Sequence, residues 1–397
     1  MTTLTRQQLY LPLLDVIDEL GGRPTAKQAA AALAVKLDIP MATRALTGNV
    51  DRGCRRNLFD RTIRWARQDL VRRGLLSAEE RNAWTLTDKG TNHLRNCRPG
   101  IVVTIYETEN GVALWADATT AAAVIEDSSI QLIITSPPYD LVTPKHYGNL
   151  NGKAYLDWLT GLAAEWKRML VDDGSLVLNL GDVWEKGQPT VSLYQERLLL
   201  RLVDDLGYHL AQKVVWHNPA KIPSSDWVTV KRVRIKNAVE NFYWLGKGRN
   251  PKADNRRILK PYTQRMTNTI AAGGETRRVR PGGHGDTRGS FGRDNGGTIP
   301  SNMFEATNAK SNDAYCRGCR EEGLPIHPAR YPDNIPAMFV KMLTDPGDTV
   351  ADFFGGSGSI GEVCECLGRR WITSERSLTY IEGSRNRFPQ LATAGQS

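Results

Sequence analysis

The sequence predicts an α/β protein with a mainly parallel sheet, preceded by a basic domain that is mostly helical. Residues 130–134 form a continuous apolar run, which is typical of a strand buried in a parallel sheet. Helical and strand-like patterns then alternate over residues 153–248. A glycine-rich turn, DFFGGSGSIG, joins a further strand to a helix at residues 352–361.

Residues 1–98 are expected to form the separate helical domain. The segment RTIRWARQDLVRRGLL places Ile63, Ala66 and Leu70 on one helical face. Next comes AWTLTDKG, which predicts a short strand and a turn, so the domain reads as a winged helix. It resembles the N-terminal domain of Mrr-type restriction proteins, which implies DNA contact; contact with another subunit only is the alternative. The arginines on a second face of the helix are Arg61, Arg64 and Arg67.

The charge distribution favours a polyanionic partner. The formal net charge is +9. Residues 1–100 hold 17 Lys/Arg against 10 Asp/Glu, and residues 241–326 hold 15 against 8. No apolar run reaches the length of a membrane span, and the first ten residues lack an apolar signal segment. Six cysteines are too few for a disulfide scaffold, so we expect a cytoplasmic protein.

The helix expected after the first buried strand is amphipathic. One of its faces carries Tyr155, Trp158, Leu159, Leu162, Trp166 and Met169. The segments SLVLNLGD, LAQKVVWHN and AVENFYWLGKG predict three more strands. The periodicity then disappears from about residue 246 to residue 325. That length of irregular chain within a compact domain is usually functional or disordered.

The glycine turn alone would suit a nicotinamide dinucleotide, because Gly356, Gly358 and Gly361 spell G-x-G-x-x-G. Asp352 directly before the turn suits a cationic ligand better than a pyrophosphate. Only 45 residues follow Asp352, so the sheet must be completed by strands earlier in the chain. One of those earlier strands ends in TSPPYD.

The combination of S-P-P-Y, followed much later by the acid-and-glycine loop, resembles the amino-methyltransferases of DNA in their permuted, β-class order. WADATT at 115–120 and HPARYP at 327–332 resemble two further family segments. The resemblance implies a Rossmann-like, circularly permuted seven-stranded sheet. Its catalytic half would span 104–245 and its cofactor half 326–388, with a target-recognition insertion at 246–325 and a tail at 389–397.

The resemblance also implies S-adenosylmethionine as cofactor. Asp352 would lie at the methionine end, Glu375 would bind the ribose hydroxyls, and Asp117 would lie near the adenine. In the family the loop usually begins Asp-Pro-Phe, whereas Phe353 replaces the proline here. The remaining expected cofactor residues are Thr135, Phe354, Gly355, Gly356, Ser357 and Gly358.

The S-P-P-Y turn, formed by Ser136, Pro137, Pro138 and Tyr139, would hold an exocyclic amine of a base flipped out of double-stranded DNA. Fixed prolines offer carbonyls and no N–H. The Pro137 carbonyl and the Ser136 hydroxyl would accept from the amine, and Tyr139 would stack on the base. The serine favours cytosine N4 in the family. Adenine N6, an RNA substrate and a non-catalytic DNA-binding regulator remain alternatives.

The sequence leaves the partners partly open. A separate restriction endonuclease would be the functional partner, and the chain could act as a monomer or a homodimer. No metal is expected, because Cys316 and Cys319 have no second C-x-x-C pair. In the insertion a basic linker without base contacts is the alternative to target recognition. The arginines expected to read the target lie among nine glycines there: Arg277, Arg278, Arg280, Arg288 and Arg293.

Overall fold

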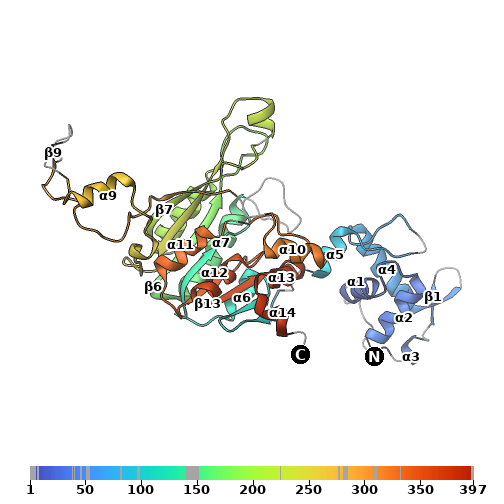
Figure 1. The fold of residues 1–397 in the computed structure, drawn as a ribbon. Helices are drawn as coiled ribbons and strands as arrows, with labels where there is room; N and C mark the ends of the chain where they lie inside the picture. The colour runs from blue at the N-terminus through green and yellow to red at the C-terminus, as the bar shows by residue number, and fades with distance from the viewer. Residues whose placement is uncertain are drawn as a thin grey trace. The chain divides into compact units, whose positions relative to one another are not determined.

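The chain divides into two compact units, Met1–Cys97 and Arg98–Ser397, which are described separately (Figure 1). In the described part of the chain, no helix combines the length and the apolar character needed to cross a membrane. The computed structural model describes residues 6, 9–37, 39, 41–44, 47–50, 54–80, 83–95, 99–139, 152–223, 225–275, 278–279, 285–307, 311–330 and 332–394.

The first unit is a small helical domain with its own core. Ile63, Ala66 and Leu70 of α4 are buried, as the periodicity predicted, whereas Arg61 and Arg64 are exposed. The side chain at its N-cap, Asn57, accepts a hydrogen bond from the next turn and so fixes where α4 begins. Its helices are α1 (Tyr10–Glu19), α2 (Ala26–Lys36), α3 (Met41–Arg44), α4 (Leu58–Arg72) and α5 (Asp88–Arg95).

The β-structure of this unit differs from the expectation. AWTLTDKG contributes only a single bridge, Leu76 to Leu86, and then enters α5. A hairpin of β1 (Thr47–Val50) and β2 (Cys54–Asn57) precedes α4 instead. The Leu86 side chain packs on the helical core.

Among its described residues, the second unit has one mixed sheet of nine strands, where seven were expected. The order is β11-β7-β8-β6-β5-β12-β13-β4-β3, with β3 and β11 at the edges. β7 and β8 are antiparallel to each other, β8 is antiparallel to β6, and β3 is antiparallel to β4; the other pairs are parallel. The strands are β3 (Val103–Glu107), β4 (Gly111–Trp115), β5 (Ile130–Thr135), β6 (Leu170–Gly181), β7 (His209–His217), β8 (Val239–Gly246), β11 (Met303–Glu305), β12 (Thr349–Asp352) and β13 (Arg370–Glu375).

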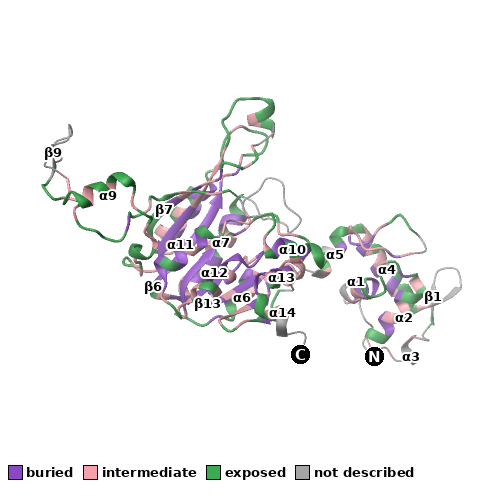
Figure 2. Cartoon of the chain, in the orientation of Figure 1, coloured by how far each residue is buried: buried purple, intermediate pink, exposed green. Residues whose placement is uncertain are grey.

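Helices cover both faces of this sheet, because its central strands are apolar on both sides (Figure 2). One face carries α6 (Ala118–Ala123), α7 (Gly152–Met169) and α8 (Tyr194–Leu200). The other carries α11 (Asn334–Leu343), α12 (Ser359–Leu367) and α13 (Leu378–Ser384). The fold is therefore a three-layer α/β/α sandwich.

Strand β12 fixes the position of the site. It comes late in the chain, yet it pairs with β5 on one side and β13 on the other. The chain runs outward from β5 to β6 in one direction and from β12 to β13 in the other. A parallel sheet has its ligand site at such a switch point, beyond the carboxyl ends of the strands.

The segment between β8 and β12 is only partly irregular. It contains α9 (Gln264–Ala271) and the short pair β9 (Arg278–Val279) and β10 (Gly285–Asp286). Strand β11 joins the main sheet beside β7, and α10 (Ala314–Glu321) buries Tyr315, Cys316 and Cys319. The later part of this segment is therefore part of the folded sandwich.

Candidate active site

The S-P-P-Y turn follows directly from the carboxyl end of β5. The Tyr139 ring lies against the last residue of β6, Gly181, where an added Cβ would come within 2.7 Å of the ring. A glycine is therefore needed at position 181 to let the tyrosine lie across the strand. Burial raises the pKa of the Tyr139 phenol well above its usual value, and the neighbouring Glu240 carboxylate raises it further.

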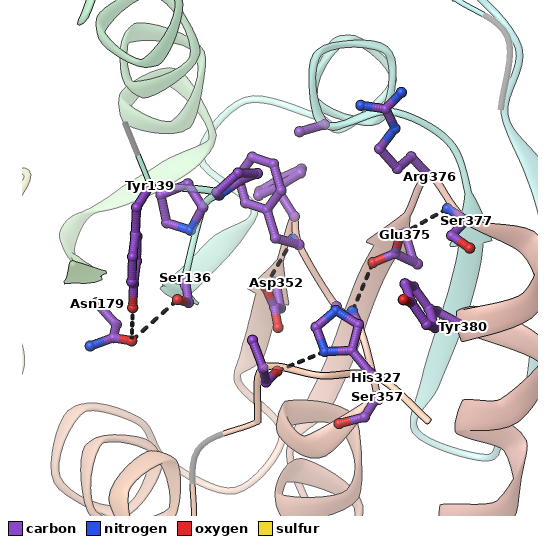
Figure 3. A pocket seen from close by; sticks show the side chains of 18 of the residues that line it. Ser136, Tyr139, Asn179, His327, Asp352, Ser357, Glu375, Arg376, Ser377 and Tyr380 are labelled. Atoms are coloured by element: carbon purple, nitrogen blue, oxygen red, sulfur yellow. Dashed lines mark hydrogen bonds between the residues drawn. The ribbon is translucent and has the colours of Figure 1, made fainter. Parts of the chain in front are cut away.

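Asn179 on β6 organises this turn (Figure 3). Its side-chain Nδ2 donates to the Asn241 carbonyl at 3.3 Å, which directs Oδ1 toward the turn. Ser136 Oγ lies 3.2 Å from that Oδ1 and donates to it, and the Tyr139 hydroxyl lies 3.1 Å from the same atom. Because the serine hydrogen is used in this way, Oγ faces a ligand as an acceptor and not as a donor.

Glu240, near the start of β8, brings a carboxylate to the same turn. Its Oε2 accepts from the Tyr139 hydroxyl at 2.9 Å, and its Oε1 pairs with Lys221 Nζ at 3.1 Å. The Glu240–Lys221 pair therefore lies behind the tyrosine hydroxyl.

Asp352 ends β12 and is 3% exposed. Its Oδ1 accepts from Thr135 Oγ1 at 2.7 Å and from the Phe354 amide at 3.0 Å. Burial raises the pKa of the Asp352 carboxyl to about 6, and these two hydrogen bonds oppose the rise. No cation among the described residues neutralises it by an ion pair, which leaves the carboxylate suited to a cationic ligand.

The glycine loop passes closer to β13 than any side chain would allow. A Cβ on Gly355 would lie 1.9 Å from Thr373 Oγ1. Gly358 has a φ of 75°, in the left-handed region, at the N-cap of α12. The loop therefore presents backbone directly to the space beyond the sheet.

Glu375 ends the neighbouring strand, β13. Its two carboxylate oxygens accept from the backbone amides of Gly356 at 3.0 Å and Ser377 at 2.8 Å. Burial raises the pKa of this carboxyl as well. The hydrogen bond to Gly356 ties the glycine loop to the next strand.

These groups surround one cavity of about 470 Å³. The structure places Ser136 to Tyr139, Asp352, Phe354 to Ser357, Glu375 and Asp117 on its wall. Thr135 and Gly358 are not on the wall: Thr135 holds Asp352, and Gly358 begins α12 behind the loop. Asp117 is committed to capping α6, because Oδ1 accepts from the amides of Thr119 and Thr120.

Sequence reasoning did not select several residues of this wall. Asn179 and Glu240 lie in segments that the sequence analysis interpreted only by their apolar pattern. A polar residue near the end of a buried strand was the feature that could have identified them. His327 lies against Gly356, where a Cβ would come within 3.0 Å of its ring. The other wall residues not selected include Tyr155, Trp158, Trp216, Arg330, Arg376, Ser377 and Tyr380.

The structure describes some of the arginines that the sequence predicts to bind DNA. Arg277 and Arg280 are outside the described residues, and for Arg278 only the backbone, in β9, is described. Arg288 and Arg293 are exposed. Arg67 is engaged inside the first unit: it donates to the carbonyls of Ser77 and Glu80 and lies over the Trp84 ring.

The pair Cys316 and Cys319 is buried in α10, where Arg330 donates to Cys316 Sγ at 3.0 Å. Within the described ranges, no group of three or more His, Cys, Asp or Glu side chains could hold a metal.

Family comparison agrees with this geometry. Residues 130–386 match the model of the family described as DNA methylase. The chain belongs to the DNA methylase family. Residues 7–96 match the Mrr N-terminal domain.

Individual DNA methylases are similar to this chain over most of their length. The Type II methyltransferase M.PvuII of Proteus hauseri is 40% identical over 286 residues, which cover 71% of this chain and 85% of the relative. M.BglII of Bacillus subtilis is 23% identical over 284 residues, covering 68% and 70%. The solved PvuII DNA methyltransferase, described as cytosine-N4-specific, superposes with a TM-score of 0.59 at 34% identity, covering 72% of this chain and 88% of that one.

Proposed function

We propose that this DNA methylase transfers a methyl group from S-adenosylmethionine to the N4 amine of a cytosine flipped out of double-stranded DNA. One observation carries the proposal: the Ser136–Tyr139 turn and the Asp352 loop, more than 200 residues apart in sequence, line the same cavity. The cytosine-N4-specific description of the PvuII enzyme favours cytosine over adenine N6.

The donor set fits the cofactor. S-adenosylmethionine supplies an electrophilic methyl group on a positively charged sulfur. The glycine loop lies between two carboxylates, the buried Asp352 and the partly buried Glu375, which suit a ligand with cationic and hydroxyl groups better than a pyrophosphate. Asp352 would bind the charged methionine end and Glu375 the ribose hydroxyls, while the absent Cβ of Gly355 lets the loop lie directly against β13.

Ser136 would prepare the amine. The lone pair of a cytosine N4 is delocalised into the ring, so the nitrogen is a weak nucleophile. An N–H bond donated to the Ser136 oxygen, and a second to the Pro137 carbonyl, draws electron density onto nitrogen and aims its lone pair at the methyl group. Asn179 keeps the serine oxygen an acceptor. The nitrogen would bond to the methyl carbon as the carbon–sulfur bond breaks, the bonding electron pair would stay on sulfur and make it a neutral thioether, and the nitrogen would release one proton to water.

Tyr139 would hold the extruded base by stacking. Its hydroxyl is fixed by Asn179 and Glu240, and its ring lies on Gly181. Both ends of the side chain are therefore fixed before the base arrives. Aromatic stacking of a base contributes about 1–3 kcal/mol.

We further infer the roles of the remaining parts. Exposed arginines in the 246–325 insertion would read the target, and Arg61 and Arg64 of the Mrr-type unit would add phosphate contacts. The enzyme would act in the cytoplasm, as a monomer or homodimer, and would protect sites that a separate restriction endonuclease cuts.

The product tests the proposal. Purified protein is incubated with S-adenosylmethionine and plasmid DNA, and the digested nucleosides are analysed by mass spectrometry. We expect N4-methylcytosine with the parental protein and none with Ser136→Ala. N6-methyladenine would assign the alternative base, and no methylated nucleoside would contradict the proposed activity.

A further inference from the structure

The chain between β7 and β8, residues 218–238, forms a loop at the edge of the sheet that bears the active site. β7 and β8 are antiparallel, and the start of β8 pairs with the carboxyl end of β6. This β7–β8 loop therefore leaves and rejoins the sheet beside Asn179 and Glu240. Figure 1 shows it projecting from the sheet, and Figure 2 shows that its residues are largely exposed.

The base of the loop is fixed by hydrogen bonds. The Asn218 amide donates to the Ala238 carbonyl at 2.7 Å, and Lys236 Nζ donates to the Pro219 carbonyl at 2.6 Å. Lys221 pairs with Glu240, the carboxylate that accepts from Tyr139. The two ends of the loop are thus held in place, and Lys221 and Glu240 connect them to the Ser136–Tyr139 turn.

Two apolar side chains near the fixed ends of the loop are almost completely exposed to solvent. Ile222 is 88% exposed and Ile235 is 90% exposed. Ile222 directly follows Lys221, so it lies one residue from the contact with Glu240. An exposed isoleucine contributes no burial of apolar surface to the stability of the fold. Beside a base-flipping site, an apolar side chain can instead fill the gap that the extruded base leaves in the stack.

The charge around these side chains selects the partner. Between residues 221 and 236 the loop holds five cations and one acid. Arg232, exposed, has a φ of 54°, a left-handed conformation uncommon for a non-glycine residue. Apolar side chains among cations suit nucleic acid better than an apolar protein surface.

Resting on the proposed function, we propose that the β7–β8 loop enters duplex DNA beside the extruded cytosine. Ile222 and Ile235 fill the space that the base leaves, and the surrounding cations contact the phosphates. The loop lies outside the 246–325 insertion, so it supports extrusion of any target rather than its choice.

The experiment compares paired and mismatched targets. A duplex containing the methylated sequence is prepared with the target cytosine either paired to guanine or opposite adenine, where extrusion costs less. We expect Ile222→Ser/Ile235→Ser to lower kcat/KM by roughly tenfold or more on the paired duplex and by much less on the mismatched one. Val124→Ser, a change at an exposed valine outside the loop, is the matched control.

The loop proposal is contradicted if the double variant loses the same factor on both duplexes, or loses nothing. Calorimetry must show that the double variant binds the cofactor with the affinity of the parental protein, whichever result the duplexes give. A parental protein that methylates neither duplex contradicts the proposed function instead. Duplex binding then tests the loop alone: Arg232→Gln must weaken it and reduce the slope of log affinity against log salt by about 1, and unchanged binding overturns the loop proposal.

Discussion

Arg387 Nε donates to the backbone carbonyl of Ser357 at 2.7 Å, so a residue far along the chain holds the glycine loop in place. The Arg387 side chain is 2% exposed and also pairs with Glu362 and Asp313. Asp313 caps α10, and Tyr315 of that helix accepts from the His327 amide at 2.8 Å. One buried guanidinium therefore links the loop, α10 and the His327 segment.

Replacing this guanidinium should loosen the loop. Arg387→Lys keeps the charge but loses the forked donor geometry. We expect S-adenosylmethionine affinity to fall by about tenfold, equivalent to about 1.4 kcal/mol. Calorimetric titration below the melting temperature of the variant measures it. Arg385→Lys, an exposed arginine two residues earlier, is the control; equal affinities for the two variants would argue against the link.

Asp352→Asn separates stability from binding. The amide keeps an oxygen for Thr135 and Phe354 but removes the buried charge. Because the folded pKa is raised to about 6, the contribution of Asp352 to stability is full below the unfolded pKa and is lost as pH rises through about 6. At pH 7 the cost is of order 2–3 kcal/mol. The variant should therefore be more stable at pH 7 while binding the cofactor more weakly.

The same carboxylate predicts a pH dependence of binding. In the parental protein, cofactor affinity should fall as pH drops below about 6, where Asp352 becomes protonated. In Asp352→Asn this fall should be absent. Titrations from pH 5 to pH 8 test it, and parallel profiles for the two proteins would exclude Asp352 as the titrating group.

Ser136 and Asn179 should act as one unit. Asn179→Ala removes the acceptor that orients the serine hydroxyl, and we expect kcat to fall about tenfold with the cofactor KM unchanged. Ser136→Ala should cost more, since it removes the contact with the amine. Adding Asn179→Ala to Ser136→Ala should then cost almost nothing further. Fully additive losses in single-turnover rates would show that the two residues act independently.

Tyr139 should matter mainly through its ring. Tyr139→Phe keeps the stacking face and loses the contacts with Asn179 and Glu240, so a loss of only a few-fold is expected. Tyr139→Ala should lose the stacking, worth about 1–3 kcal/mol. Rates measured with saturating cofactor distinguish them. If the two variants were equally impaired, the hydroxyl and not the ring would be the important group.

The sequence was enough to select the site residues that directly follow a strand, because strand ends and turns have local residue patterns. The predicted strand at 130–134 and the helix face of Tyr155 and Trp166 are both present and buried. It could not identify Asn179 or Glu240, whose roles depend on which strands become neighbours. β8 lies beside β6 only because the chain doubles back at the sheet edge. Arg387 was missed for the same reason, since its partners are 25 to 74 residues away along the chain.

The segment at residues 246–325 shows that ordered structure can also be missed where the sequence has no clear periodicity. Its glycines hid the periodicity, yet β11 pairs with β7 and α10 joins the cofactor side. Those contacts are long-range, and nothing local in the sequence marks them. Target reading by the 246–325 insertion therefore stays a prediction.

Base-resolution sequencing of genomic DNA tests the central claim most directly. Cells expressing the parental protein are compared with cells expressing Ser136→Ala, with detection of modified bases. We expect N4-methylcytosine at every copy of one short sequence in the parental cells and at none in the variant cells. N6-methyladenine at that sequence, or N4-methylcytosine that persists with Ser136→Ala, would contradict the claim that the cavity lined by Ser136 and Asp352 methylates cytosine.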